Sequence, residues 1–112
     1  MNRYKLIKAG VDANEALEKF SFDPSFYEKM LMKFKEDDVF EKMCKAVEAH
    51  DVVNGFSYAH SLKGEVGNLS MTRLYKSVCL LVEELRAGRT DKLDEYLEVV
   101  KADYAAVIEA LS

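Results

Sequence analysis

The sequence predicts an all-α fold: an antiparallel four-helix bundle with a short additional N-terminal helix that covers one end. Apolar residues recur every three to four positions through most of the 112 residues. The chain holds one proline and five glycines, and β-branched residues are too sparse to indicate strands. Because the connections between the periodic segments are short, consecutive helices are expected to run antiparallel. We expect residues 1–112 to form one domain.

The first two helices are marked by their N-caps. Asp12 with Glu15 resembles a capping box and predicts a short helix over about 12–20. The apolar residues of this helix are Ala16, Leu17 and Phe20. Asp23-Pro24 places an N-cap before a proline at the first helical position, and this helix is predicted to end near Lys35. Its apolar face comprises Phe26, Tyr27, Met30, Leu31 and Phe34.

A further helical segment follows, with Asp37 or Asp38 as its expected cap. Its apolar residues are Phe40, Met43, Cys44 and Val47. The pattern leaves two possibilities open: a separate helix, or a continuation of the preceding one through a kink at 36–38. His50 is expected at the C-terminal end of this segment, where a positive charge favours the helix dipole.

The next two helices form a predicted hairpin. Asp51 caps the first, which runs to about Val66 or Gly67. The stretch 67–70 is predicted to be a loop, with Ser70 as the cap of the second helix. The apolar residues of that second helix are Leu74, Val78, Leu81 and Leu85.

The last connection begins with a glycine C-cap at Ala87-Gly88. Thr90 or Asp91 is expected to start the final helix. Its apolar residues are Leu93, Tyr96, Leu97, Val100, Tyr104, Val107, Ile108 and Leu111.

Composition excludes several functions. A formal charge of −4 without a basic stripe argues against nucleic-acid binding. No apolar run is long enough to cross a bilayer, and the first residues lack the apolar core of a signal peptide. Cys44 and Cys79 have no metal-ligand spacing and are expected to be buried, reduced thiols in a cytoplasmic protein. Methionines at helical spacing are expected in the core rather than as ligands; these are Met30, Met32, Met43 and Met71. No metal site is predicted.

The helix predicted to follow Asp51 carries a strip of residues suited to a reaction or to partner binding. At about 100° per residue, the members of this strip point within about 60° of the His60 direction. They are Val53, Phe56, Ser57, His60, Lys63, Gly64 and Gly67. The opposite face is apolar and is expected to be buried; it comprises Gly55, Ala59, Leu62, Val66 and Leu69. His60 is therefore predicted to face solvent, with two glycines that leave room for a partner.

The strip suits phosphoryl transfer. A neutral, exposed imidazole nitrogen can attack a phosphoryl group, and Lys63, one turn later, can balance the charge on the phosphoryl oxygens. Val53 and Phe56 offer an apolar rim for a partner. From the residues alone, an ordinary solvated helix face explains the strip equally well. A partner-binding bundle in which His60 is unused is a second hypothesis, and a metal-binding bundle ranks last because too few ligands are present.

The residues 59–64, Ala-His-Ser-Leu-Lys-Gly, closely resemble the AHxLKG signature of histidine-containing phosphotransfer (HPt) domains of two-component phosphorelays. The resemblance extends over nearly the whole chain. Residues 10–17 look like the family's entry into its first helix, residues 26–34 look like its second helix, and Asp51 before the motif also fits.

The resemblance implies a four-helix bundle whose exposed His60 accepts a phosphoryl group from a receiver-domain aspartate and passes it to another receiver. Lys63 then corresponds to the family's lysine beside the phosphohistidine, and Gly64 to its glycine under the docked receiver. Mg²⁺ is expected on the partner receiver, and no cofactor in this chain. A hybrid sensor kinase is a possible further partner. The resemblance implies a phosphocarrier rather than an autonomous kinase, and we expect a cytoplasmic monomer. The sequence leaves open whether the chain is a free-standing protein, which is the expectation, or a domain cut from a larger hybrid kinase.

Two positions depart from the family pattern. The family often has glycine where this chain has Ser70, and a serine there is expected to cap the next helix. Members often place Glu or Gln against the histidine ring from the following helix. The register here puts Val82 at that place with Glu83 adjacent, so the sequence leaves open which of them faces His60.

Overall fold

Seven helices make up the computed structural model, which describes residues 1–112 and contains no strand. They are α1 (Arg3–Lys8), α2 (Ala13–Lys19), α3 (Pro24–Glu36), α4 (Val39–Glu48), α5 (Val52–Asn68), α6 (Thr72–Arg86) and α7 (Leu93–Ala110). The predicted all-α fold class is confirmed. None of these helices combines the length and apolar character that a membrane span requires.

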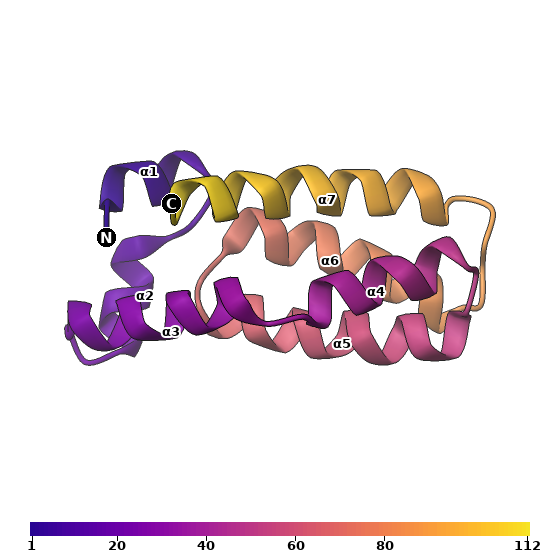
Figure 1. The fold of residues 1–112 in the computed structure, drawn as a ribbon, viewed down its shortest axis with the longest axis horizontal. Coiled ribbons are helices and arrows are strands. Elements are labelled where there is room, and N and C mark those ends of the chain that lie inside the picture. Colours follow the sequence, from indigo (N-terminus) through magenta and orange to yellow (C-terminus); the bar gives the residue numbers. More distant parts are fainter.

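The bundle is formed by α4, α5, α6 and α7. Each packs on the next, and α7 also contacts α4, which closes the ring. Figure 1 shows α3 and α4 lying end to end along one edge, with both chain termini at the same end as α1 and α2. The N-terminal region thus holds two short helices where the sequence predicted one. The additional helix, α1, is capped by Asn2, whose side chain accepts a hydrogen bond from the Lys5 amide at 3.1 Å.

Helices α3 and α4 are separate, so the chain is not one continuous helix kinked at residues 36–38. Asp37 has an extended backbone (φ −72°, ψ 138°), which interrupts the helical path. Its carboxylate Oδ1 accepts a hydrogen bond from the Val39 amide at 2.9 Å, and this satisfies one of the free donors at the start of α4. The break therefore comes from a capping aspartate rather than from a bend in a continuous helix.

Five helix ends use a residue with left-handed backbone geometry. The residues that follow the C-caps are Gly10 (φ 88°), Ser21 (φ 56°), His50 (φ 56°), Ser70 (φ 56°) and Gly88 (φ 71°). The amide after Ser70, that of Met71, donates to the Val66 carbonyl at 3.0 Å, the bond expected of a Schellman motif. Glycine is favoured at such a position because it lacks a Cβ. The predicted glycine stop after Ala87 is confirmed.

Two predicted N-caps are wrong. Ser70 does not cap α6: it ends α5, which extends to Asn68, and Met71 precedes α6 without a side-chain cap bond. The Ser70 hydroxyl instead donates to Glu15 Oε1 at 3.0 Å. The final helix begins after Lys92, not at Thr90 or Asp91.

Most residues assigned to the core are buried, with three exceptions that matter for the surface. Phe26, placed on the apolar face of its helix, is 48% exposed. Met32, expected in the core, is 37% exposed on the outer side of α3. Cys79 is half-buried rather than buried, whereas Cys44 lies in the core. Burial raises the pKa of the Cys44 thiol to about 11, so this thiol stays protonated at neutral pH.

Tyr27 connects α3 to the C-terminal end of α5 through a hydrogen bond. Its side chain is fully buried, and its hydroxyl donates a hydrogen bond to the Leu69 carbonyl at 2.9 Å. Burial, and to a smaller extent the nearby Asp12, raise the pKa of Tyr27 to about 12, which keeps this donor protonated. The bond satisfies a carbonyl at the α5 terminus that has no helical partner.

Tyr27→Phe is expected to lower the free energy of unfolding by about 1–2 kcal/mol, because the buried Leu69 carbonyl loses its hydrogen-bond donor. Urea titration followed by circular dichroism measures the change. Tyr4→Phe is the matched control, because the Tyr4 side chain is 69% exposed. Equal midpoints for Tyr27→Phe and wild type would show that the bond contributes nothing to stability.

Candidate functional site

The two faces of α5 are separated as the sequence predicted. Residues of the apolar face are buried in the bundle: Gly55, Ala59, Leu62, Val66 and Leu69. Gly55 permits close helix packing, since a Cβ there would lie 3.3 Å from Leu85 Cδ2 and 3.4 Å from Val47 Cγ2. The opposite strip is exposed at Val53, Ser57, His60 and Gly64 and half-buried at Phe56, Lys63 and Gly67.

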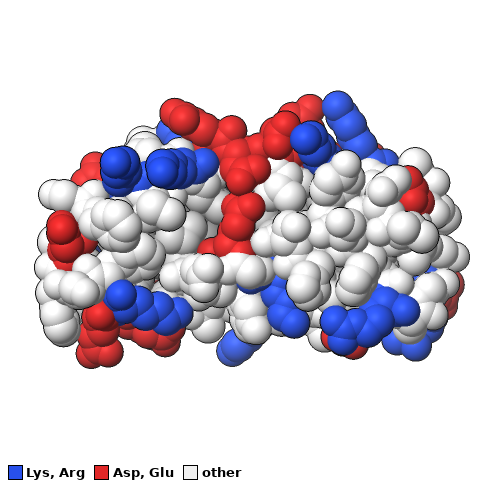
Figure 2. All heavy atoms as spheres, turned by 90° about the horizontal axis from the view of Figure 1, so that it is seen from below, with Lys and Arg blue, Asp and Glu red and all other residues white.

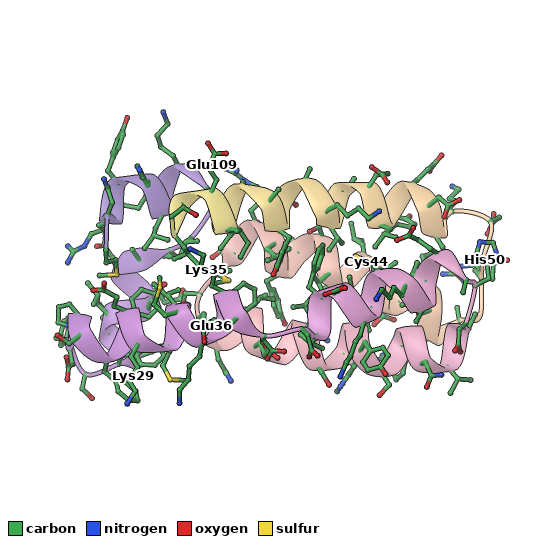
Figure 3. The ribbon with its side chains drawn as sticks, in the orientation of Figure 1. Lys29, Lys35, Glu36, Cys44, His50 and Glu109 are labelled. Atoms are coloured by element: carbon green, nitrogen blue, oxygen red, sulfur yellow. The ribbon has the colours of Figure 1, made fainter.

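The His60 ring faces solvent and has one aromatic neighbour. Its centroid lies 5.7 Å from that of Phe56, one turn earlier, with the ring planes tilted by 33°. No side-chain hydrogen bond in the protein involves His60. Both ring nitrogens are therefore free of hydrogen bonds to other side chains or to the backbone. The second histidine, His50, lies in the α4–α5 turn at the end of the molecule away from the termini (Figure 3).

His60 borders a shallow depression of about 280 Å³. Its lining consists of His60, Lys63, Gly64, Gly67, Asn68 and Tyr75. The Lys63 ammonium makes no ion pair within the protein, since none of the salt bridges includes it. A free cation one helical turn from a free imidazole is an arrangement that can hold an anionic group between them.

The two glycines of the strip have different surroundings. A Cβ on Gly64 would meet no heavy atom within 4 Å, so nothing inside the protein requires a glycine there. A Cβ on Gly67 would lie 3.1 Å from Cε1 of the Tyr75 ring, which packs across from α6. The close approach of Tyr75 therefore explains why position 67 is a glycine. The Gly67 carbonyl also accepts a hydrogen bond from Lys19 Nζ at 3.0 Å.

Neither Val82 nor Glu83 accepts a hydrogen bond from the His60 ring. Val82 is fully buried in the bundle core. The exposed Glu83 carboxylate pairs with Arg86 at 3.2 Å, and the Arg86 guanidinium lies 5.6 Å from the centre of the Phe56 ring. The α6 side chain that lies over Phe56 is therefore a cation, and it provides no hydrogen-bond acceptor for the imidazole.

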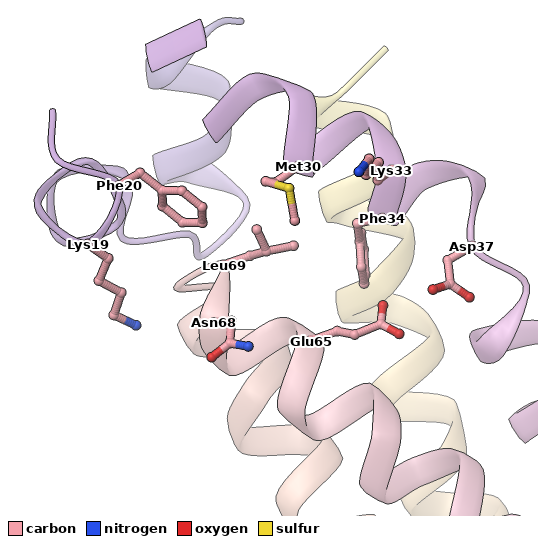
Figure 4. A pocket seen from close by; sticks show the side chains of 9 residues that line it. All are labelled: Lys19, Phe20, Met30, Lys33, Phe34, Asp37, Glu65, Asn68 and Leu69. Carbon is pink, nitrogen blue, oxygen red and sulfur yellow. The ribbon is translucent and has the colours of Figure 1, made fainter. Parts of the chain in front are cut away.

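A larger groove of about 560 Å³ lies beside the C-terminal half of α5 (Figure 4). Its lining consists of Lys19, Phe20, Met30, Lys33, Phe34, Asp37, Glu65, Asn68 and Leu69. Asn68 also lines the depression beside His60, so the two hollows are adjacent. In the groove wall, desolvation first and then hydrogen bonding with Asp37 raise the pKa of Glu65 to about 7.

The surface charge is uneven along this face. Figure 2 looks at the molecule from below the view of Figure 1, and acidic side chains form a band from its upper edge to its centre. A largely uncharged area lies beside that band, with Lys and Arg side chains along one edge. Along α5, none of the exposed residues is Asp, Glu, Lys or Arg; they are Val53, Asn54, Ser57, His60, Ser61, Gly64 and Asn68. An uncharged surface bordered by cations suits contact with a partner protein.

Asn68 and Tyr75 were not anticipated from the sequence as neighbours of His60. The signal available for Tyr75 is the tight antiparallel connection between α5 and α6. Residues at similar distances from such a turn lie opposite one another, which places Tyr75 beside Gly67. Asn68 was assigned to a loop, and only the continuation of α5 brings it onto the strip.

The fold and this strip define a helical bundle that presents a free histidine on one face. The family model described as the Hpt domain matches residues 30–110, more than half of the chain. The protein therefore belongs to the Hpt domain family and carries the phosphotransfer-histidine module of phosphorelays. A search of curated proteins found no match. A search of solved structures likewise found none.

Glu65→Gln is expected to change how stability depends on pH. A folded-state pKa of about 7, above the ordinary 4.5, means that the folded protein holds this proton more tightly than the unfolded chain. The resulting stabilisation is complete below about pH 4.5 and is lost as the pH rises through about 7. Glutamine does not titrate. At pH 8 the free energy of unfolding of the variant is therefore expected to exceed that of wild type by up to about 1 kcal/mol, after allowance for solvent screening.

Thermal unfolding of both proteins between pH 4.5 and 8 measures this difference. Glu109→Gln serves as the control, since that exposed glutamate lies on α7 and makes no ion pair. Stability curves of Glu65→Gln and wild type that remain parallel over this range would contradict the assignment.

Proposed function

We propose that the protein is a phosphorelay intermediate that accepts a phosphoryl group from a receiver-domain aspartate onto His60 and passes it to another receiver. The observation that carries the proposal is the free, solvent-facing His60 beside the unpaired Lys63, in a chain that belongs to the Hpt domain family. Members of this family interact with receiver domains or kinases.

The transfer step balances without a cofactor in this chain. The lone pair of an unprotonated His60 ring nitrogen forms the N–P bond while the P–O bond to the receiver aspartate breaks. The electrons of that bond remain on the aspartate carboxylate, and the other ring nitrogen keeps its proton. Lys63 balances charge on the phosphoryl oxygens as they pass between the two proteins. The proposal assigns Mg²⁺ to the receiver.

The exposed strip provides a surface for the receiver. Val53 is 79% exposed, and Phe56 is half-buried beside it on α5, so the two offer apolar surface to a partner. Ser57 and Gly64 carry little or no side-chain bulk, so a partner backbone can approach the imidazole closely. Gly67 lies at the far end of the strip. These residues form the proposed docking surface, and His60 lies within it.

His60→Gln is expected to abolish phosphoryl labelling. Incubation of the protein with receiver domains phosphorylated by acetyl phosphate should give acid-labile, base-stable phosphate on wild type only. His50→Gln is the matched control, because His50 is also exposed but lies in the α4–α5 turn. Lys63→Ala should label about tenfold more slowly, because one electrostatic donor is lost. Equal labelling of wild type and His60→Gln would contradict the proposal, and receiver binding without any transfer would favour a non-catalytic interaction module.

Gly64→Ala is expected to raise the stability of the protein and to lower its rate of phosphoryl transfer. Since nothing lies within 4 Å of the added methyl group, alanine should raise the free energy of unfolding by about 0.5–1 kcal/mol through its higher helix propensity. The same methyl group projects into the docking surface and should slow transfer. Urea denaturation and a transfer assay measure the two effects. A variant that is more stable and transfers at the wild-type rate would show that the receiver does not use the space at Gly64.

A further inference from the structure

The Phe56 ring links His60 to the neighbouring helix. On one side it contacts the imidazole one turn further along α5, with 5.7 Å between the ring centroids. It also faces α6, where the Arg86 guanidinium carbon lies 5.6 Å from its centroid. Arg86 is in turn paired with Glu83, with 3.2 Å between Nη1 and Oε1. Four side chains from two helices thus form a continuous series that ends at the imidazole.

This series contains an aromatic contact with the imidazole. Helical side chains lean toward the helix N-terminus, so a residue rests on the side chain three or four positions earlier. For His60 that neighbour is Phe56, and no hydrogen bond holds the imidazole. The position from which an acceptor was expected to reach the ring is occupied by Val82, which is buried in the core.

We infer that Phe56, held in place by Arg86, positions the His60 ring for phosphoryl transfer. The inference rests on the proposed function and adds to it a means of fixing the imidazole. The aromatic contact favours the rotamer in which the imidazole lies beside the Phe56 ring over the rotamers that turn away from it. The cation over Phe56 fixes that ring relative to α6. The nucleophilic nitrogen is thereby held toward the docking surface before a receiver arrives, which raises the fraction of encounters with a reactive geometry.

The first test uses the unphosphorylated protein alone. The three-bond couplings between Hα and Hβ of His60, measured by NMR, report its χ1 rotamer. Wild type is expected to show one dominant rotamer, and Phe56→Leu is expected to show averaged couplings, because leucine fills similar space without a flat ring. Phe56→Tyr should restore the wild-type couplings. Phe26→Leu is the matched control: Phe26 is a partly exposed aromatic residue of α3 with no contact to His60.

Arg86 is tested in the same way. Arg86→Gln should broaden the rotamer distribution of His60 although Arg86 does not touch the imidazole. Arg89→Gln is the control, since Arg89 also pairs with one glutamate, Glu84, but lies over no aromatic ring. Wild-type couplings in both Phe56→Leu and Arg86→Gln would overturn the inference whether or not the protein transfers phosphate.

The second test separates positioning from docking. If Phe56 positions the imidazole, Phe56→Leu should lower the transfer rate at saturating receiver by about threefold to tenfold, the range expected of an aromatic contact. Phe56→Tyr should recover most of that rate. A variant that only weakens receiver binding, with the saturated rate unchanged, would assign Phe56 to docking and overturn the positioning role. Absence of transfer in wild type would refute the proposed function instead, and the rotamer result would stand separately.

Discussion

Burial of one face of α5 is the constraint on which the site depends. Ala59 and Leu62 are fully buried between the neighbouring helices, and Gly55 lets those helices approach closely. Because successive residues of a helix are about 100° apart, the burial of Ala59 turns the next residue, His60, toward solvent. The exposure of the histidine is therefore a consequence of core packing. Any change that rotated α5 would cost apolar burial along its whole length.

Some residues of the site have no partner within the protein, whereas others are contacted by side chains of α6. A Cβ on Gly64 would meet no heavy atom within 4 Å, and Lys63 has no ion-pair partner, so both are available to an incoming protein. Phe56 is contacted from α6 by Arg86, and Gly67 by Tyr75. Contacts between α5 and α6 thus surround the histidine without covering it. This division suits a protein whose chemistry needs a second protein to complete it.

Several features followed directly from the sequence. The period of apolar residues placed six of the seven helices close to their observed positions, and the direction of His60 was derived from spacing alone. The N-terminal helix α1 was missed because its short segment buries only Leu6, too few apolar residues to show a period. Ser70 was misassigned since a serine between two helices suits an N-cap, whereas here it takes the left-handed position usually held by glycine.

The sequence by itself determined the fold class, the buried and exposed faces of α5, and the outward histidine with its lysine, because these depend on helical period and burial within one segment. Only the tertiary structure decided the break between α3 and α4, the separate reasons for Gly64 and Gly67, and the Arg86–Phe56 contact beside His60. These features depend on side chains from different helices or on local capping geometry. The distance between two helices and the register of their facing residues are set by packing of the whole bundle, and no single stretch of sequence contains them.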